Sequence, residues 1–272
     1  MVNPGSKKMT SPPLVKETWA DLRELISGSR IVLFLDFDGT LTSVHDRPEL
    51  AQLSRSMRSR LCRLASSVTV AIVSGRDRDD VAEKVGLENL TYAGCHGFDI
   101  EDPNLPPVPK FAHYVTAGEV KGFGEAIRDA VGSVSGTIVK VKTWAVAVHY
   151  REVAPGDIDH LESSIMKLVD SCSKFRARKG KKVIEVTPDV DWDKGRAVAW
   201  LLNIFEERDG PALPIYIGDD ITDEDAFRTL SGLGITILVS GRDKETAASF
   251  RVKDPVEVGW FLDRVLKLLE TR

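Results

Sequence analysis

The chain has 272 residues, of which 42% are hydrophobic, and its 37 Lys and Arg against 41 Asp and Glu leave a net charge of −4. This is the composition of a globular protein with a sizeable core, and it excludes a disordered or fibrous chain. The mild acidity argues against nucleic acid as a partner, because phosphate backbones call for clustered Lys and Arg. The longest apolar runs, such as Ile31–Leu35, have five residues. A membrane helix needs about 20, so we expect no membrane partner.

Cysteines are few and show no metal-binding or disulfide pattern. The chain has three cysteines, Cys62, Cys95 and Cys172, and no CxxC pair. An odd, sparse set argues against a disulfide framework or a structural zinc site. Residues 1–13 have no apolar stretch behind their lysines, so we expect a tail and not a signal peptide. We therefore expect a cytoplasmic protein, and we expect it to be a monomer.

The first part of the chain alternates apolar strands with helical patterns. Strands are predicted over 31–38, 68–73 and 90–94, and a helix is predicted where apolar residues recur at helical spacing between Met57 and Ala65. Wholly apolar strands indicate burial on both faces, as in a parallel sheet. Strands alternating with helices predict a parallel sheet wound on both sides.

The middle of the chain has a different pattern. Residues 101–110 contain four prolines and are predicted to be a linker. Beyond it we expect helices near 119–131 and 157–171, and strands in adjacent pairs at 137–142, 144–150, 175–178 and 182–186. Strands that follow one another without a helix between them suggest an antiparallel α+β module.

The last part returns to the first pattern. Predicted elements are a helix over 194–205, a strand over 213–218, a helix over 223–230, a strand over 235–239 and a final amphipathic helix from Val258 to Leu269. The prediction is an α/β fold whose parallel-sheet core is interrupted by a smaller α+β domain. Its limits are a tail and helix over 1–29, core over 30–110, insertion over 111–187 and core over 188–272.

The first strand ends in the motif DFDGT, residues 36–40. In open α/β sheets, ligands bind beyond the carboxyl ends of the strands. Asp36 and Asp38 are two residues apart, so on an extended chain both side chains can face one site. One aspartate can attack phosphorus, while a second protonates the leaving oxygen and later deprotonates water. Asp36 and Asp38 are therefore candidate catalytic residues.

A second acidic motif, GDD with Asp219 and Asp220 followed by Asp223, ends another buried strand. Two acidic strand ends in one sheet can share a hard cation, and Mg²⁺ usually takes one or two protein carboxylates. Such a cation reduces the repulsion between an anionic nucleophile and a phosphate. Glu224 and Asp225 are more typical of an acidic first helical turn.

Two further segments have the chemistry of phosphate binding. Ser74-Gly75-Arg76 ends the second strand, where a hydroxyl and backbone amides can hold phosphate oxygens. The alternative for this segment is an ordinary turn at a helix start. Lys194 opens a helix against the macrodipole, so it needs a nearby anion, unless it is a surface lysine. Phosphate and the aspartates would supply that anion, which makes Ser74, Gly75 and Lys194 the expected phosphate site.

These motifs, in this order, resemble the haloacid-dehalogenase-like phosphohydrolases. The stretches DFDGTL, AGCHGFDI, VHYR, GKKVIEV, WDKG and GDDITDEDAF are similar to those of trehalose-6-phosphate phosphatases. The resemblance covers nearly all of residues 31–267. It implies a Rossmann-like core with an inserted cap domain, which agrees with the insertion inferred from the strand pattern.

The resemblance implies roles for the core residues. Asp36 corresponds to the nucleophile and Asp38 to the general acid and base. Mg²⁺ is the implied cofactor, with Asp36, the backbone carbonyl of Asp38, and Asp219 as ligands. Asp220 and Asp223 either support the metal ligands or orient the lysine that binds phosphate together with the serine.

The resemblance also implies sugar contacts. The matching cap positions are Lys142, Arg151, Lys181 and Glu185. His96 either contacts the sugar or caps the hinge. The family usually has glutamate two residues before the first of these lysines, whereas this chain has Lys140. That departure affects one sugar contact and leaves the phosphatase chemistry unchanged.

The expected activity is Mg²⁺-dependent hydrolysis of trehalose 6-phosphate to trehalose and phosphate, through an aspartyl-phosphate. The expected partner is thus a small-molecule sugar phosphate. Sucrose 6-phosphate or mannosyl-3-phosphoglycerate is the alternative substrate within the class, and a phosphomutase is less favoured. A non-catalytic sugar-phosphate sensor is the alternative of another class. The four residues Asp36, Asp38, Lys194 and Asp219 argue against a sensor, which would not need both carboxylates of DFDGT.

Overall fold

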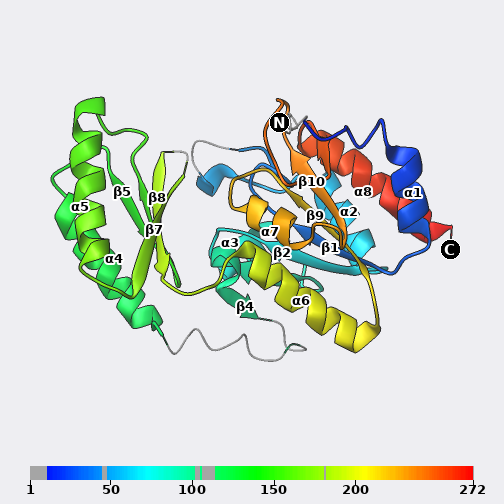
Figure 1. Ribbon diagram of the computed structural model, residues 1–272, viewed down its shortest axis with the longest axis horizontal. Helices are drawn as coiled ribbons and strands as arrows, with labels where there is room; N and C mark the ends of the chain where they lie inside the picture. The colour runs from blue at the N-terminus through cyan, green and yellow to red at the C-terminus, as the bar shows by residue number, and fades with distance from the viewer. Residues whose placement is uncertain (1–10, 45–47, 102–104, 106–113, 181, 272) are drawn as a thin grey trace, which may run out of the picture.

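The computed structural model describes residues 11–44, 48–101, 105, 114–180 and 182–271 (Figure 1). Within these residues the strands form a seven-stranded sheet and a four-stranded sheet. The larger sheet has the order β11-β10-β9-β1-β2-β3-β4. Its strands are β1 (Ile31–Leu35), β2 (Thr69–Val73), β3 (Thr91–Gly94), β4 (Asp99–Glu101), β9 (Leu213–Gly218), β10 (Ile235–Val239) and β11 (Phe250–Val252).

The larger sheet is parallel except for its edge strand β4, which pairs antiparallel with β3. From β1 the chain proceeds to β2 and β3 on one side, and later returns to β9 on the other side of β1. The order of strands therefore reverses between β1 and β9. Ligands bind at such a switch point in open α/β sheets, outside the carboxyl ends of the strands.

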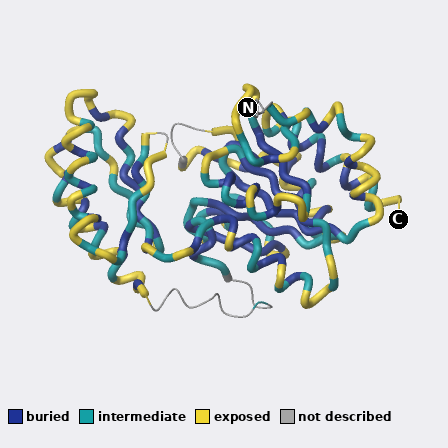
Figure 2. The backbone as a smooth tube through the Cα atoms, viewed as in Figure 1, coloured by how far each residue is buried: buried dark blue, intermediate teal, exposed yellow. Residues whose placement is uncertain are grey.

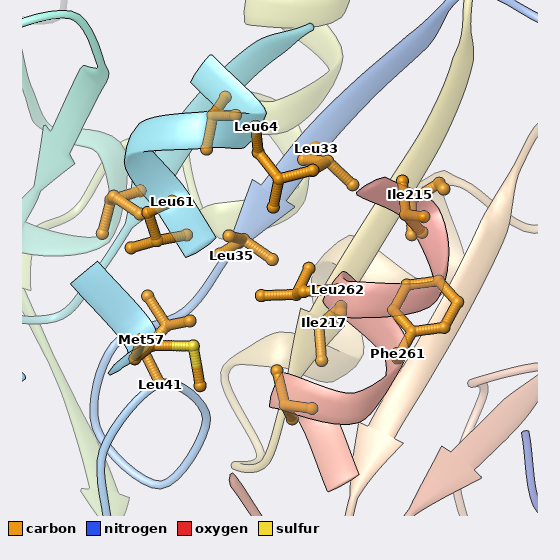
Figure 3. Close-up of a cluster of buried hydrophobic side chains, with 14 of the residues drawn as sticks. Leu33, Leu35, Leu41, Met57, Leu61, Leu64, Ile215, Ile217, Phe261 and Leu262 are labelled. Atoms are coloured by element: carbon orange, nitrogen blue, oxygen red, sulfur yellow. The ribbon is translucent and has the colours of Figure 1, made fainter. Parts of the chain in front are cut away.

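Helices cover both faces of this sheet (Figure 1). Apolar residues of α1 (Trp19–Ser27), α2 (Arg55–Ala65), α3 (Arg78–Val85) and α8 (Pro255–Glu270) form one cluster with the sheet, part of which is shown in Figure 3. A second cluster contains residues of α6 (Lys194–Asp209) and α7 (Asp223–Thr229). Along β1, Leu33 and Leu35 belong to the first cluster and Phe34 to the second. Burial on both faces explains the continuous apolar run of this strand.

The smaller sheet, called the cap sheet below, has the order β5-β6-β8-β7 and is antiparallel throughout. Its strands are β5 (Ile138–Val141), β6 (Val146–His149), β7 (Phe175–Gly180) and β8 (Val183–Pro188). Two helices accompany it in the sequence, α4 (Ala117–Val131) and α5 (Ile158–Asp170). Alternate residues such as Val148, Ile184 and Val186 pack in one cluster with α4 and α5. The helices lie on the side of the cap sheet away from the core (Figure 1), and in Figure 2 their outer surface is exposed.

The predicted fold class, a parallel-sheet α/β core with an inserted α+β cap, is confirmed. Most predicted elements agree with the structure within a few residues, but β4 and β11 were not predicted. Each has three residues, too few for a period to be recognised. The tail at residues 1–10 and most of the proline-rich linker lie outside the described residues, and the domain limits stay predictions. None of the described helices is long and apolar enough to cross a membrane.

The packing of α6 against α7 predicts opposite effects for two Gly→Ala substitutions in helices. A Cβ atom on Gly195 would lie 2.4 Å from the backbone oxygen of Asp225, whereas a Cβ on Gly122 in α4 meets nothing within 4 Å. We expect Gly195→Ala to destabilise the fold by about 1–3 kcal/mol through overpacking. Gly122→Ala should instead stabilise it by up to about 1 kcal/mol. Urea unfolding measures both, and an unchanged stability of Gly195→Ala would show that this contact can relax.

Candidate active site

A buried ion cluster occupies the switch point. Asp36 follows β1 and is 5% exposed, and its backbone N–H donates to Ile217 O of β9 at 2.9 Å. Lys194, the first residue of α6, is 3% exposed. Its Nζ donates to Asp36 Oδ1 and to Asp223 Oδ1, both at 2.7 Å. The anion expected for a lysine at a helix start is therefore present as two carboxylates.

Asp223 holds this cluster together. Its Oδ1 also accepts a hydrogen bond from the hydroxyl of Tyr216 at 2.7 Å. Its Oδ2 accepts from the backbone N–H groups of Asp219 and Asp220, both at 2.9 Å. Of the two roles considered for Asp223, these bonds favour the orientation of Lys194 and of the loop after β9.

Asp219 lies against the DFDGT turn. Gly39 has φ +82°, and a Cβ there would lie 2.2 Å from Asp219 Oδ2, so both backbone conformation and space require glycine. Asp219 Oδ1 is buried and has no hydrogen-bond partner among the described residues. Burial, together with Asp36 and Asp223, raises the pKa of Asp219 to about 9. This carboxylate is therefore in a place that favours a cation.

The donor set fits a divalent metal ion. Oxygen atoms of Asp36, Asp219 and Asp223 lie within 4.8 Å of one another. Burial raises the pKa of Asp36 to about 7, since the opposing charge of Lys194 is shared with Asp223. When all three carboxyl groups are ionised, one ammonium group leaves an excess of negative charge. Hard cations such as Mg²⁺ bind oxygen ligands and remove that excess.

Asp38 is more accessible, with 40% of its side chain exposed. Both of its oxygens accept hydrogen bonds from Arg76, at 2.6 Å from Nε and 2.7 Å from Nη2. Arg76 was overlooked as a site residue, although it is the third residue of the SGR motif. The signal was present, because an arginine beside a strand end of the same sheet can reach the neighbouring carboxylates.

The predicted phosphate loop follows β2. Ser74 is 1% exposed, and its hydroxyl accepts from the backbone N–H of Arg76 at 3.2 Å. The carbonyl of Gly75 accepts from Lys142 Nζ of the cap at 2.7 Å. A Cβ on Gly75 would lie 2.7 Å from the ring of His96. Since β1 and β2 are adjacent and parallel, this loop lies beside Asp36 at the same edge of the sheet.

Three of the predicted sugar-binding residues meet where the cap contacts the core. Glu185 of β8 accepts from Lys142 Nζ through Oε1, and its Oε2 is hydrogen-bonded to His96 Nε2, both at 2.7 Å. Although burial opposes it, the charges of His96 and Lys142 hold the pKa of Glu185 well below its usual range. Both oxygens of Glu185 are thus paired within this group, whereas His96 Nδ1 is buried without a hydrogen-bond partner among the described residues.

The backbone that presents His96 is strained. Cys95, His96 and Gly97 all have positive φ, at 48°, 58° and 89°. Such conformations are costly for residues other than glycine, and they persist where the surroundings hold them. Here the backbone N–H groups of Cys95 and His96 donate to Arg76 O and Ser74 O, at 2.7 and 2.9 Å. The turn thereby fixes the imidazole between the phosphate loop and the cap.

The cleft between Lys194 and the cap is small. It is lined by residues that include His96, Glu185, Trp192 and Lys194, and its volume is about 30 Å³. That is room for one or two water molecules and far too little for a sugar. In this arrangement of cap and core, the cleft beside Lys194 therefore has no room for a sugar.

Arg151, another of the predicted cap residues, lies away from this group. Arg151 follows β6 beside the β7–β8 turn, where Tyr150 N donates to Lys182 O, and so lies at the opposite end of the cap sheet from the β5–β6 turn that contacts the core. Lys181 lies outside the described residues. Arg176 and Arg178 line the cleft but were not predicted. Their alternation with apolar Phe175 and Ala177 was the available signal.

The fold and the acidic switch point together define the haloacid-dehalogenase-like α/β class. The C-terminal domain of the trehalose-6-phosphate phosphatase of C. albicans has this fold, with a TM-score of 0.79, 22% identity, and coverage of 96% of this chain and 99% of that one. The sequence model of the trehalose-phosphatase family matches residues 34–256. The chain belongs to that family, which confirms the resemblance noted in the sequence.

The chain matches only part of the length of several related proteins. The trehalose-phosphate phosphatase of Mycobacterium marinum is 36% identical over 246 residues, covering 89% of this chain and 63% of its own length. An uncharacterized glycosyl hydrolase of Mycobacterium tuberculosis is 38% identical over 280 residues, which is 97% of this chain but 20% of its own length. The chain thus spans between a fifth and two thirds of these relatives.

The crowded carboxylates predict how stability depends on pH in metal-free protein. The pKa values of Asp36 and Asp219 in the fold, about 7 and about 9, exceed the ordinary 3.8. The folded state therefore binds more protons than the unfolded chain between about pH 4 and 9, so these groups make the unfolding free energy fall as pH rises. Mg²⁺ should remove this decline, because it keeps both carboxylates ionised in the fold.

Urea unfolding at several pH values, in EDTA and in Mg²⁺, measures this effect. The difference between the two series isolates the effect of the site from that of His149. Burial lowers the pKa of His149, so this residue makes the unfolding free energy rise with pH. In Asp219→Asn the gap between the series should shrink. A gap that stays constant with pH in the wild type would contradict the prediction.

Proposed function

We propose that this chain is a Mg²⁺-dependent phosphomonoesterase that hydrolyses trehalose 6-phosphate. The observation that carries the proposal is the Lys194 ammonium between Asp36 and Asp223 at the switch point, next to Asp219. This is an arrangement that can hold a phosphate and a divalent cation beside a carboxylate nucleophile. Membership of the trehalose-phosphatase family supports the choice of substrate. The cytoplasmic location and the monomeric state stay predictions.

In the first chemical step, an oxygen of Asp36 attacks phosphorus and the bond from phosphorus to the sugar oxygen breaks. Asp38 gives its proton to that oxygen, so the sugar leaves as an alcohol. Lys194, the Ser74 hydroxyl and the Gly75 amide bind the other phosphate oxygens. Proximity of these groups to a fixed nucleophile lowers the barrier by avoiding the entropy loss of a bimolecular reaction.

In the second step, Asp38 removes a proton from water, and the water oxygen attacks phosphorus. The bond between phosphorus and Asp36 breaks, which releases inorganic phosphate and restores the carboxylate. Asp36, Asp219 and the backbone carbonyl of Asp38 would hold Mg²⁺. The cation would supply charge neutralisation for a dianionic substrate that approaches an anionic nucleophile.

The nucleophile can be tested directly with phosphate release from a panel of trehalose 6-phosphate, sucrose 6-phosphate and mannosyl-3-phosphoglycerate. We expect the first to be the best substrate of the wild type. Asp36→Asn should abolish turnover, because an amide neither attacks phosphorus well nor binds Mg²⁺ strongly. Asp129→Asn, an exposed position on α4, is the matched control and should retain activity. Substantial turnover by folded Asp36→Asn would refute the assignment, and preference for another ester would change only the substrate.

Substrate selection is predicted to depend on Glu185. A buried polar partner left unpaired costs about 1–3 kcal/mol, so Glu185→Ala should lower kcat/KM for trehalose 6-phosphate by roughly ten- to a hundredfold. Hydrolysis of p-nitrophenyl phosphate, which lacks the sugar hydroxyls, should change little. Glu125→Ala on the exposed face of α4 is the control. An unchanged ratio of the two kcat/KM values in Glu185→Ala would mean that Glu185 does not contact the sugar.

A further inference from the structure

Arg76 contacts the predicted acid and base through a two-pronged ion pair. Its Nε and Nη2 donate to the two oxygens of Asp38 at 2.6 and 2.7 Å. The Arg76 side chain is only 10% exposed, whereas that of Asp38 is 40% exposed. A bidentate bond of this kind fixes the plane of a carboxylate as well as its position.

Arg76 is itself held from several directions. Its guanidinium lies over the ring of the buried Phe37, with 5.4 Å from Cζ to the ring centroid, and its Nη1 donates to Asp80 Oδ2 at 2.7 Å. Its backbone N–H donates to the Ser74 hydroxyl, and its carbonyl accepts from the N–H of Cys95. The arginine is thus a rigid support that links the phosphate loop to Asp38.

The ion pair leaves some of the lone-pair sites of the Asp38 carboxyl group unused. A carboxylate has about four lone-pair sites on its two oxygens, and the fork of Arg76 uses one on each oxygen. The remaining sites are available to a leaving oxygen or a water molecule. Lysine at position 76 could keep the charge but not the planar fork, so it would hold Asp38 less firmly.

We propose that Arg76 is a positioning residue that orients the carboxyl group of Asp38 toward the oxygen of the leaving group. This inference rests on the proposed phosphatase function. The proposed role differs from simple stabilisation of the turn between β2 and α3. A structural role affects every substrate alike, whereas a role through Asp38 depends on how much the leaving group needs a proton.

The test compares kcat/KM for two esters in wild type, Arg76→Lys, Asp38→Asn and the double variant. The leaving group of trehalose 6-phosphate is a sugar alkoxide unless it is protonated, so its departure needs general-acid help, which is typically worth about 10²- to 10⁴-fold. p-Nitrophenyl phosphate leaves as a stable phenolate and needs little. The parameter kcat/KM includes only steps up to departure of the leaving group, so water attack does not enter. Arg78→Lys, also near the start of α3 but paired with Asp79, is the matched control.

We expect Arg76→Lys to lower kcat/KM at least about tenfold for the sugar phosphate and less than about threefold for the aryl ester, as a loss of general-acid assistance requires. In the Asp38→Asn background the same substitution should have less than about a twofold effect, since coupled residues are not additive. Equal losses for both esters, or additive losses in the double variant, would overturn the role of Arg76 but leave the proposed phosphatase function standing. If the wild type hydrolyses neither ester, the proposed function fails, and this inference fails with it.

Discussion

An imbalance of charge at the switch point determines much of this structure. Carboxylates of Asp36, Asp219 and Asp223 converge there, and one buried lysine is shared between two of them. Coulombic repulsion in a buried site is weakly screened, so the carboxylates must be held in place by fixed donors. The hydroxyl of Tyr216 and two backbone N–H groups supply those donors to Asp223. Asp219 Oδ1, which has no donor among the described residues, is the oxygen best placed to bind a cation.

At the contact between cap and core, charged side chains are likewise held in place by hydrogen bonds. Glu185 pairs with both Lys142 and His96, and Lys142 also donates to the phosphate loop at Gly75 O. Arg178 of the cap pairs with Asp225 of α7 at 3.1 Å. Under the proposed function, a sugar would replace part of these bonds with its own hydroxyl groups. Selectivity can then arise from the cap, because a ligand that fails to re-pair these groups leaves buried charges unsatisfied.

The sequence predicted the parts of this molecule that depend on local pattern. Apolar strands ending in carboxylates were sufficient to predict a parallel sheet with Asp36 and Asp219 at one edge. The pairing of Arg76 with Asp38 could not be predicted in the same way, because it depends on how two loops approach one another. The same is true of the His96–Glu185 contact, which joins residues 89 positions apart. The strained backbone at Cys95 and His96 goes against the local preference of both residues and is set by tertiary contacts.

The most direct test of the account is calorimetric titration of metal-free protein with Mg²⁺. The wild type should bind the ion and release protons near pH 7, because the cation displaces the proton that a raised pKa retains on Asp219. Asp219→Asn should weaken binding by at least about tenfold, as loss of a carboxylate ligand requires. Asp225→Asn, on the same helix as Asp223 but directed at the cap, should bind as the wild type does. Undiminished binding in Asp219→Asn would contradict the claim that the carboxylates at the switch point form a cation site.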